Sequence, residues 1–113
     1  MKKSRQADYV HLAVMRDAVS AIKSYTRGGA RKFYKAKLVQ DAVIYQLGLL
    51  GEAASRVNVS TRRVLDDVPW KSVIQNRQYR VHPLAAVSLR EVWKTVSKLV
   101  PQIGITLNRH SAR

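Results

Sequence analysis

The chain has 113 residues, which suits one domain with a buried core, and we expect a single domain over residues 1–113. It has no cysteine, which excludes disulfides and thiolate metal sites, and no apolar run approaches the ~20 residues of a membrane span. Lys and Arg number 21 against 7 Asp and Glu, a net charge of +14. We therefore expect a soluble, cytoplasmic protein with a polyanionic partner, most often nucleic acid. A solvated basic surface or an acidic protein partner would give the same composition.

Two long helices are predicted in the first half of the chain. Residues 7–26 place apolar side chains three or four positions apart, as one face of an amphipathic helix requires: Leu12, Met15, Val19, Ile22 and Tyr25. The glycine pair at 28–29 ends this helix. Residues 36–57 are apolar nearly all round, which is typical of the most buried helix of a bundle. Gly48 and Gly51 within it would let another helix approach closely.

Shorter helices are predicted in the middle of the chain. Ser60 is a candidate N-cap for a helix over residues 61–66, because its hydroxyl can accept from a backbone N–H of the first turn. Pro69 suits the first turn of a further helix over 69–80, where its missing N–H costs nothing.

The last predicted helix opens at a capping box, SLRE, at residues 88–91 and runs to about Leu99. Pro101 is expected to stop or kink it, since proline removes a backbone donor. Residues 104–113 are then expected to form a loose tail. With no strand alternation or repeats, the sequence predicts an all-α bundle of four or five helices.

Common enzyme signatures are missing from the sequence. The seven carboxylates show no spacing that demands a metal or a paired acid and base, and the three histidines share no metal-ligand spacing. There is no phosphate-binding glycine motif and no nucleophile elbow. We therefore expect no metal and no cofactor.

The segment RQYRVHP, residues 77–83, holds the best candidates for chemistry. In an unbroken helix, Arg77 and His82 would point ~140° apart. A residue before proline is pushed out of the helical region, so the helix should end near Arg80 or Val81. His82 would then lie in a turn, free to point back toward the face that carries Arg77.

An arginine beside a histidine suits metal-free RNA cleavage. His82 could take the proton of a ribose 2′-OH, and Arg77 could hold the phosphate and stabilise charge on its oxygens, leaving a 2′,3′-cyclic phosphate. A two-fold dimer would supply the second acid–base group that one chain lacks. Tyr79 and Arg80 could stack on a base or touch phosphate. Alternatively, His82 only caps the last carbonyls of a helix and Arg77 serves its dipole.

The segment RGGARKFYKAK, residues 27–37, has five positive charges, no acid and two aromatic residues. Basic residues interleaved with aromatics are typical of an RNA contact, and the candidates here are Arg31, Lys32, Lys35 and Lys37. The alternative is a solvated loop whose Phe33 and Tyr34 pack down before the next helix. Both could hold together, with the aromatic rings inside and the lysines on phosphate.

Three segments, in chain order, resemble the HepT-like branch of the HEPN family. They are QDAVIYQLGLLGEAASRV (40–57), VPWKSVIQNRQYRVH (68–82) and VSLREVWKTV (87–96). The likeness runs from about Asp8 to Pro101. It implies a HEPN-type up-and-down bundle of four to five helices that pairs into a homodimer.

The family resemblance also implies an activity. HEPN members share a motif R-x4-6-H, which Arg77 and His82 match, so the resemblance implies an RNase toxin controlled by a minimal nucleotidyltransferase antitoxin of the MNT type. Gln78 would orient the arginine or a phosphate, although a smaller polar residue such as asparagine is usual there, and Pro83 replaces the usual glycine. HepT-like members extend the motif to R-x4-H-x-Y, with AMP attached to the tyrosine. Leu84 stands at that position, so this modification cannot operate.

Two functions of different class are therefore expected. The first is a metal-independent endoribonuclease that cleaves RNA, for instance tRNA, with Arg77 and His82 catalytic at a homodimer cleft and RNA bound by Gln78, Tyr79, Arg80 and the basic segment. The second is a catalytically degenerate binding module that dimerises and holds a nucleotidyltransferase partner, RNA or both. The departures at positions 78, 83 and 84 favour it. A DNA-binding protein is a weaker third, since no helix-turn-helix is evident.

Overall fold

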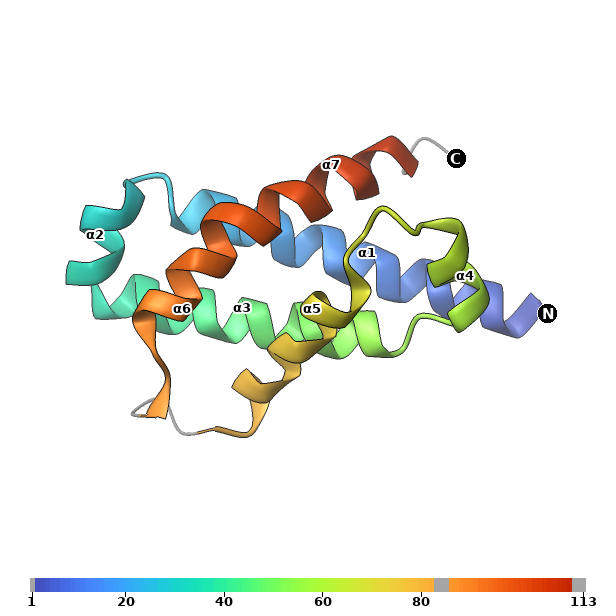
Figure 1. Cartoon of the computed structure of the whole chain (residues 1–113), viewed down its shortest axis with the longest axis horizontal. Helices are drawn as coiled ribbons and strands as arrows, with labels where there is room; N and C mark the ends of the chain where they lie inside the picture. Colours follow the sequence, from blue (N-terminus) through green and yellow to red (C-terminus); the bar gives the residue numbers. More distant parts are fainter. Residues whose placement is uncertain (1, 83–85, 111–113) are drawn as a thin grey trace.

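The computed structural model describes residues 2–82 and 86–110, and the side chains of residues 8–82 and 86–109. These residues form helices and turns, with no strand among them (Figure 1). In chain order the elements are α1 (Lys2–Tyr25), α2 (Gly29–Lys35), α3 (Lys37–Ser55), α4 (Val59–Val64), α5 (Trp70–Gln75), the 3₁₀ helix η1 (Asn76–Arg80), α6 (Leu89–Lys94), the π-helical turn η3 (Thr95–Leu99) and α7 (Val100–His110).

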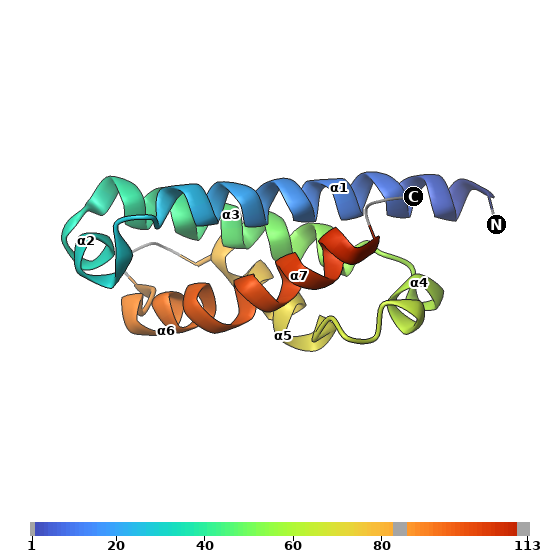
Figure 2. The same ribbon diagram turned by 90° about the horizontal axis from the view of Figure 1, so that it is seen from above.

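The long helices lie in two layers. α1 and α3 run antiparallel and pack along each other, and α5–η1 and α6–α7 cover them from one side (Figure 1 and Figure 2). α2 and α4 are short connecting helices at opposite ends of the bundle. The arrangement confirms the predicted all-α, HEPN-type bundle.

The core lies between these two layers. The largest fully buried side chains come from both layers and from α2: Met15, Ile22, Phe33, Leu47, Leu50, Ile103 and Leu107. Each such side chain contributes ~1.5–3 kcal/mol through removal of its apolar surface from water. The predicted inner face of the first helix is confirmed at Met15, Val19 and Ile22, whereas Tyr25 is 40% exposed and lies outside the core.

Two helix caps show how local polar groups fix the boundaries. Ser88 is the N-cap of α6 and accepts a hydrogen bond from the Glu91 N–H at 3.3 Å, which is the first of the two hydrogen bonds of the predicted capping box. The predicted Ser60 cap is wrong. Asn58 is the N-cap of α4, because its backbone is extended and its Oδ1 accepts from the Ser60 N–H at 3.1 Å.

The loose tail predicted for residues 104–113 is also wrong as far as His110, and residues 111–113 lie outside the described residues. The helix does not stop at Pro101. The preceding turn, Thr95–Leu99, is π-helical, and this wider turn accommodates a residue that has no N–H and would crowd the carbonyl four residues earlier. The helix then continues because Ile103 and Leu107 bury one face against α1.

Two glycines of α3 set how closely η1 can pack, as predicted for Gly48 and Gly51. A Cβ atom at Gly51 would lie 2.5 Å from the backbone nitrogen of Arg77 and 2.8 Å from the carbonyl carbon of Asn76. A Cβ atom at Gly48 would lie 2.8 Å from the Cδ of Arg80, which is a flexible side chain. At Gly51, therefore, the backbones of α3 and η1 meet with no room for a side chain.

We expect Gly51→Ala to destabilise the fold by ~1–3 kcal/mol, because α3 and η1 must separate to admit the methyl group. Gly48→Ala is the matched control in the same helix, since Arg80 can move aside and alanine is the better helix former. Urea unfolding of both variants measures the difference. Equal stability of the two variants would contradict the close backbone approach at Gly51.

Candidate active site

The segment Arg77–Arg80 lies in η1, which continues α5 with a tighter pitch. The helix ends at Arg80, and the N–H groups of Val81 and His82 both donate to the carbonyl of Gln78, at 3.2 and 3.0 Å. This confirms the predicted end near Arg80 or Val81. Pro83 and Leu84 lie outside the described residues.

Asn76 anchors this turn from inside the bundle. Its side chain is 4% exposed, and its Nδ2 donates to the carbonyl of Val73 at 3.1 Å. Since Gly51 of α3 meets the next peptide group, the backbone at Arg77 is fixed from two sides. The side chains of Arg77 and Gln78 nevertheless remain exposed. A fixed backbone with solvent-facing side chains is what a binding or catalytic site needs.

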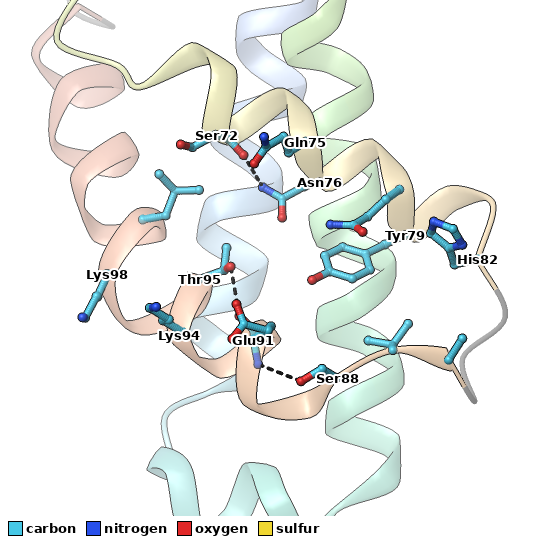
Figure 3. A pocket seen from close by; sticks show the side chains of 14 residues that line it. Ser72, Gln75, Asn76, Tyr79, His82, Ser88, Glu91, Lys94, Thr95 and Lys98 are labelled. Carbon is cyan, nitrogen blue, oxygen red and sulfur yellow. Dashed lines mark hydrogen bonds between the residues drawn. The ribbon is translucent and has the colours of Figure 1, made fainter.

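His82 lies at one end of an open cleft between η1 and α6–η3, with a volume of about 590 Å³. Figure 3 shows Tyr79 pointing across this cleft toward α6, with His82 at one end and Lys94 and Lys98 at the other. The wall on the η1 side adds the amides of Gln75 and Gln78. The cleft is polar and mixed in charge, because Glu91 also lines it.

Arg77 does not line the His82 cleft. It lines a neighbouring cavity of about 490 Å³ together with Arg62, Trp70, Lys71, Ile74, Gln75 and Gln78. Successive residues of a 3₁₀ helix point ~120° apart, which is why Arg77 and Tyr79 face different sides. Within one chain, then, Arg77 and His82 occupy adjacent cavities, and Gln75 and Gln78 line both.

Tyr79 is the one group among the described residues whose pKa clearly departs from its ordinary value. Partial burial of its ring raises the pKa of the phenol above 10.0, and the nearby Glu91 carboxylate raises it further. The phenol of Tyr79 therefore keeps its proton to higher pH than an ordinary tyrosine, and its hydroxyl can donate a hydrogen bond in the cleft.

Arg80, the other predicted contact in this turn, lies elsewhere. Its guanidinium carbon sits 5.8 Å from the ring centre of Tyr45, and its stem packs against Gly48. Arg80 lines neither cavity, so the structure separates it from the other candidate residues.

Most of the basic segment at residues 27–37 is the helix α2, Gly29–Lys35, rather than a loop; a turn precedes it, and Lys37 begins α3. Phe33 is fully buried and its ring centre lies 5.1 Å from that of Trp93, whereas Tyr34 is 45% exposed. The predicted RNA contacts Arg31, Lys32, Lys35 and Lys37 are all exposed, and Lys37 pairs with Asp41 at 3.0 Å. None of these four cations lines either cavity.

Several residues of the two cavities were not predicted from the sequence. The cavity lined by Arg77, called the basic cavity below, also holds Arg62, Trp70 and Lys71. The His82 cleft also holds Glu91, Lys94 and Lys98. Only the helical spacing of Glu91, Lys94 and Lys98 offered a signal, since it places them on one helix face. Among the described residues, no group of three or more potential metal-binding side chains occurs, and no helix is long and apolar enough to cross a membrane.

The described residues thus form an all-α bundle with Arg77 on an anchored helical turn and His82 just past the end of that turn. The family described as Ribonuclease HepT-like matches residues 15–109, so the chain belongs to the HepT-like ribonuclease family. It is 31% identical over 104 residues to the "Probable ribonuclease HepT" of Thermococcus cleftensis, which covers 91% of this chain and 92% of that protein.

A second relative is larger. The chain is 26% identical over 95 residues to "Gamma-glutamylcyclotransferase and putative RNase MJ0434" of Methanocaldococcus jannaschii. That match covers 83% of this chain and 43% of that protein, so the chain spans less than half of it. No solved structure matches the chain significantly.

The raised pKa of Tyr79 predicts how stability changes at alkaline pH. Above pH ~10 the unfolded chain loses the phenol proton more readily than the folded chain, so the free energy of unfolding should fall as pH rises. Tyr79→Phe should make this decline shallower, and Glu91→Gln should do so by less. Urea unfolding at pH 8 to 11 measures it, with Tyr9→Phe, an exposed tyrosine of α1, as the control that should keep the parent slope.

Proposed function

We propose that this protein is a metal-independent endoribonuclease toxin of a HEPN/MNT toxin–antitoxin pair, acting in the cytoplasm on RNA such as tRNA. The observation that carries the proposal is the family match combined with Arg77 and His82 on one exposed, anchored turn. A HepT-like ribonuclease has RNA as its substrate, and the net charge of +14 suits a polyanion.

In the proposed reaction, the ribose 2′-oxygen attacks the adjacent phosphorus while His82 takes its proton. A new P–O2′ bond forms, the P–O5′ bond breaks, and the leaving 5′-oxygen receives a proton from a second acid. Arg77 donates hydrogen bonds to the non-bridging phosphate oxygens as charge builds on them. The products are a 2′,3′-cyclic phosphate and a 5′-hydroxyl.

The proposed active unit is a homodimer. Arg77 and His82 of one chain line adjacent cavities and not the same one, which favours a site that needs a second copy. Pairing two copies about a two-fold axis would bring two copies of each residue to one cleft and supply both the base and the acid. Gln78, which lines both cavities, would orient the phosphate between them.

The proposed antitoxin is an MNT-type nucleotidyltransferase. With Leu84 at the position of the AMP-accepting tyrosine, we propose that this partner restrains the toxin by binding it and not by modifying residue 84.

The second candidate function is a catalytically degenerate binding module for the nucleotidyltransferase, RNA or both. The separate cavities of Arg77 and His82 favour it, together with Gln78, Pro83 and Leu84 in place of the usual residues. Cleavage and binding therefore have to be measured on the same preparation.

We expect the purified protein to cleave a tRNA pool in EDTA and to leave 2′,3′-cyclic phosphate ends. His82→Ala and Arg77→Ala should each lower the rate by ~10²-fold or more, as removal of an acid–base group or a charge-stabilising donor does. Arg63→Ala is the matched control, because Arg63 is an exposed arginine of α4 that lines neither cavity.

Cleavage that persists in both variants would contradict the proposed roles, and cleavage abolished by EDTA would contradict metal independence. RNA binding with no cleavage by the parent chain would support the binding module. Expression of the parent chain without its partner should slow growth, and His82→Ala should relieve this toxicity.

A further inference from the structure

The basic cavity beside Arg77 has a composition that the His82 cleft lacks. Its lining holds three cations, Arg62, Lys71 and Arg77, and no carboxylate. Trp70 and Ile74, both partly buried against the core, supply apolar surface, and Gln75 and Gln78 supply amides. A volume of about 490 Å³ lies within the range of small-ligand pockets.

The cations of this cavity are available to a ligand. Arg62 donates from Nε to the carbonyl of Val57 and from Nη2 to the carbonyl of Ser55, both at 3.0 Å. These two bonds fix the guanidinium and leave three of its five N–H donors. Lys71 and Arg77 are exposed, and neither forms an ion pair with a carboxylate of the described residues.

Trp70 provides an oriented aromatic surface among these cations. Its indole Nε1 donates to the carbonyl of Leu65 at 2.9 Å, which holds one edge of the ring against the chain. A ring fixed by its edge loses little freedom when a base stacks on it, and every base has a face that can stack. Aromatic surface beside phosphate-binding cations is how proteins hold single-stranded RNA without reading its sequence.

We propose that this basic cavity is a nucleotide-binding subsite, in which Arg62, Lys71 and Arg77 contact phosphate and Trp70 contacts a base of single-stranded RNA. The choice of RNA as the ligand of this subsite rests on the proposed function. Gln75 and Gln78 line both cavities, so a strand that crosses them passes from the subsite to His82. The apolar surface and this continuity favour RNA over an acidic protein.

Trp70 fluorescence tests the subsite without depending on cleavage. The chain has two tryptophans, so Trp93→Phe leaves Trp70 as the reporter, and His82→Ala keeps the RNA intact. We expect a short single-stranded RNA to quench Trp70 emission saturably. Lys71→Ala should weaken binding severalfold and reduce the slope of log K against log salt by about 0.7, the value of one single-strand phosphate contact. Lys71→Glu should abolish the quenching.

Arg63→Ala and Arg63→Glu are the matched controls, since this arginine neighbours Arg62 on α4 but lines neither cavity. If Trp93→Phe does not fold, fluorescence anisotropy of labelled RNA with the Lys71 and Arg63 variants gives the same comparison. Equal effects of Lys71 and Arg63 substitutions would overturn the subsite, as would equal quenching by polyglutamate, which would make the cavity a docking site for acidic protein.

The subsite and the proposed ribonuclease fail in different ways. Quenching that depends on Lys71, with no cleavage by the parent chain, would leave the subsite in place and remove the ribonuclease. Cleavage that depends on His82, with neither quenching nor an effect of Lys71, would remove the subsite alone.

Discussion

The contact between Gly51 of α3 and the backbone of Asn76 and Arg77 is the constraint on which the candidate site depends. The α5–η1 segment is short, and a helix of this length has little stability in water by itself. Tertiary packing holds it: the glycine beneath it, the buried Asn76 and the buried Val73. Arg77, Gln78 and Tyr79 are therefore attached to a turn whose position depends on the absence of a side chain at Gly51.

The second constraint is how the few carboxylates are used. Asp41, Glu52 and Asp67 pair with nearby cations, and Asp8 is buried where it accepts from the Asn58 N–H and the Thr61 hydroxyl, at 2.8 and 2.5 Å. The three exposed ion pairs, those of Asp41, Glu52 and Asp67, add little stability. Their effect is on where positive charge remains. Four of the seven acids are thus engaged elsewhere, and the lining of the cavity around Arg77 holds no carboxylate, so its cations remain for a polyanionic ligand.

The sequence predicted the long helices well, because apolar periodicity over many turns leaves few alternatives. The capping box at Ser88 and the close approach at Gly51 also followed from residue type alone. The end of the chain was predicted wrongly because Pro101 suggested a stop, although Ile103 and Leu107 continued the apolar pattern beyond it. For such a conflict, burial of two large side chains outweighs one missing backbone donor.

The cavities could not be predicted in the same way. Arg62 reaches the basic cavity from α4, and it does so because its guanidinium is tied to carbonyls at the end of α3 and in the turn that follows. Which cavity Arg77 and His82 each line depends on the helices packed around η1, namely α4, α5 and α6, and the spacing of residues does not indicate this packing. Spacing along the chain identified the two candidate side chains. Only the packed bundle shows that they face different cavities.

The π-helical turn at Thr95–Leu99 has a consequence for the phase of the last helix. One line of buried residues runs through α6, η3 and α7: Val92, Val96, Val100, Ile103 and Leu107. This line advances fifteen positions in four turns, or ~3.75 residues per turn against the 3.6 of an α-helix. A regular α-helix would carry this apolar line progressively away from the core, and the wide turn restores its alignment. Deleting one residue there would rotate α7 by ~100° relative to α6 and turn Ile103 and Leu107 toward solvent. The length of this segment is therefore constrained more strictly than its one buried residue, Val96, suggests.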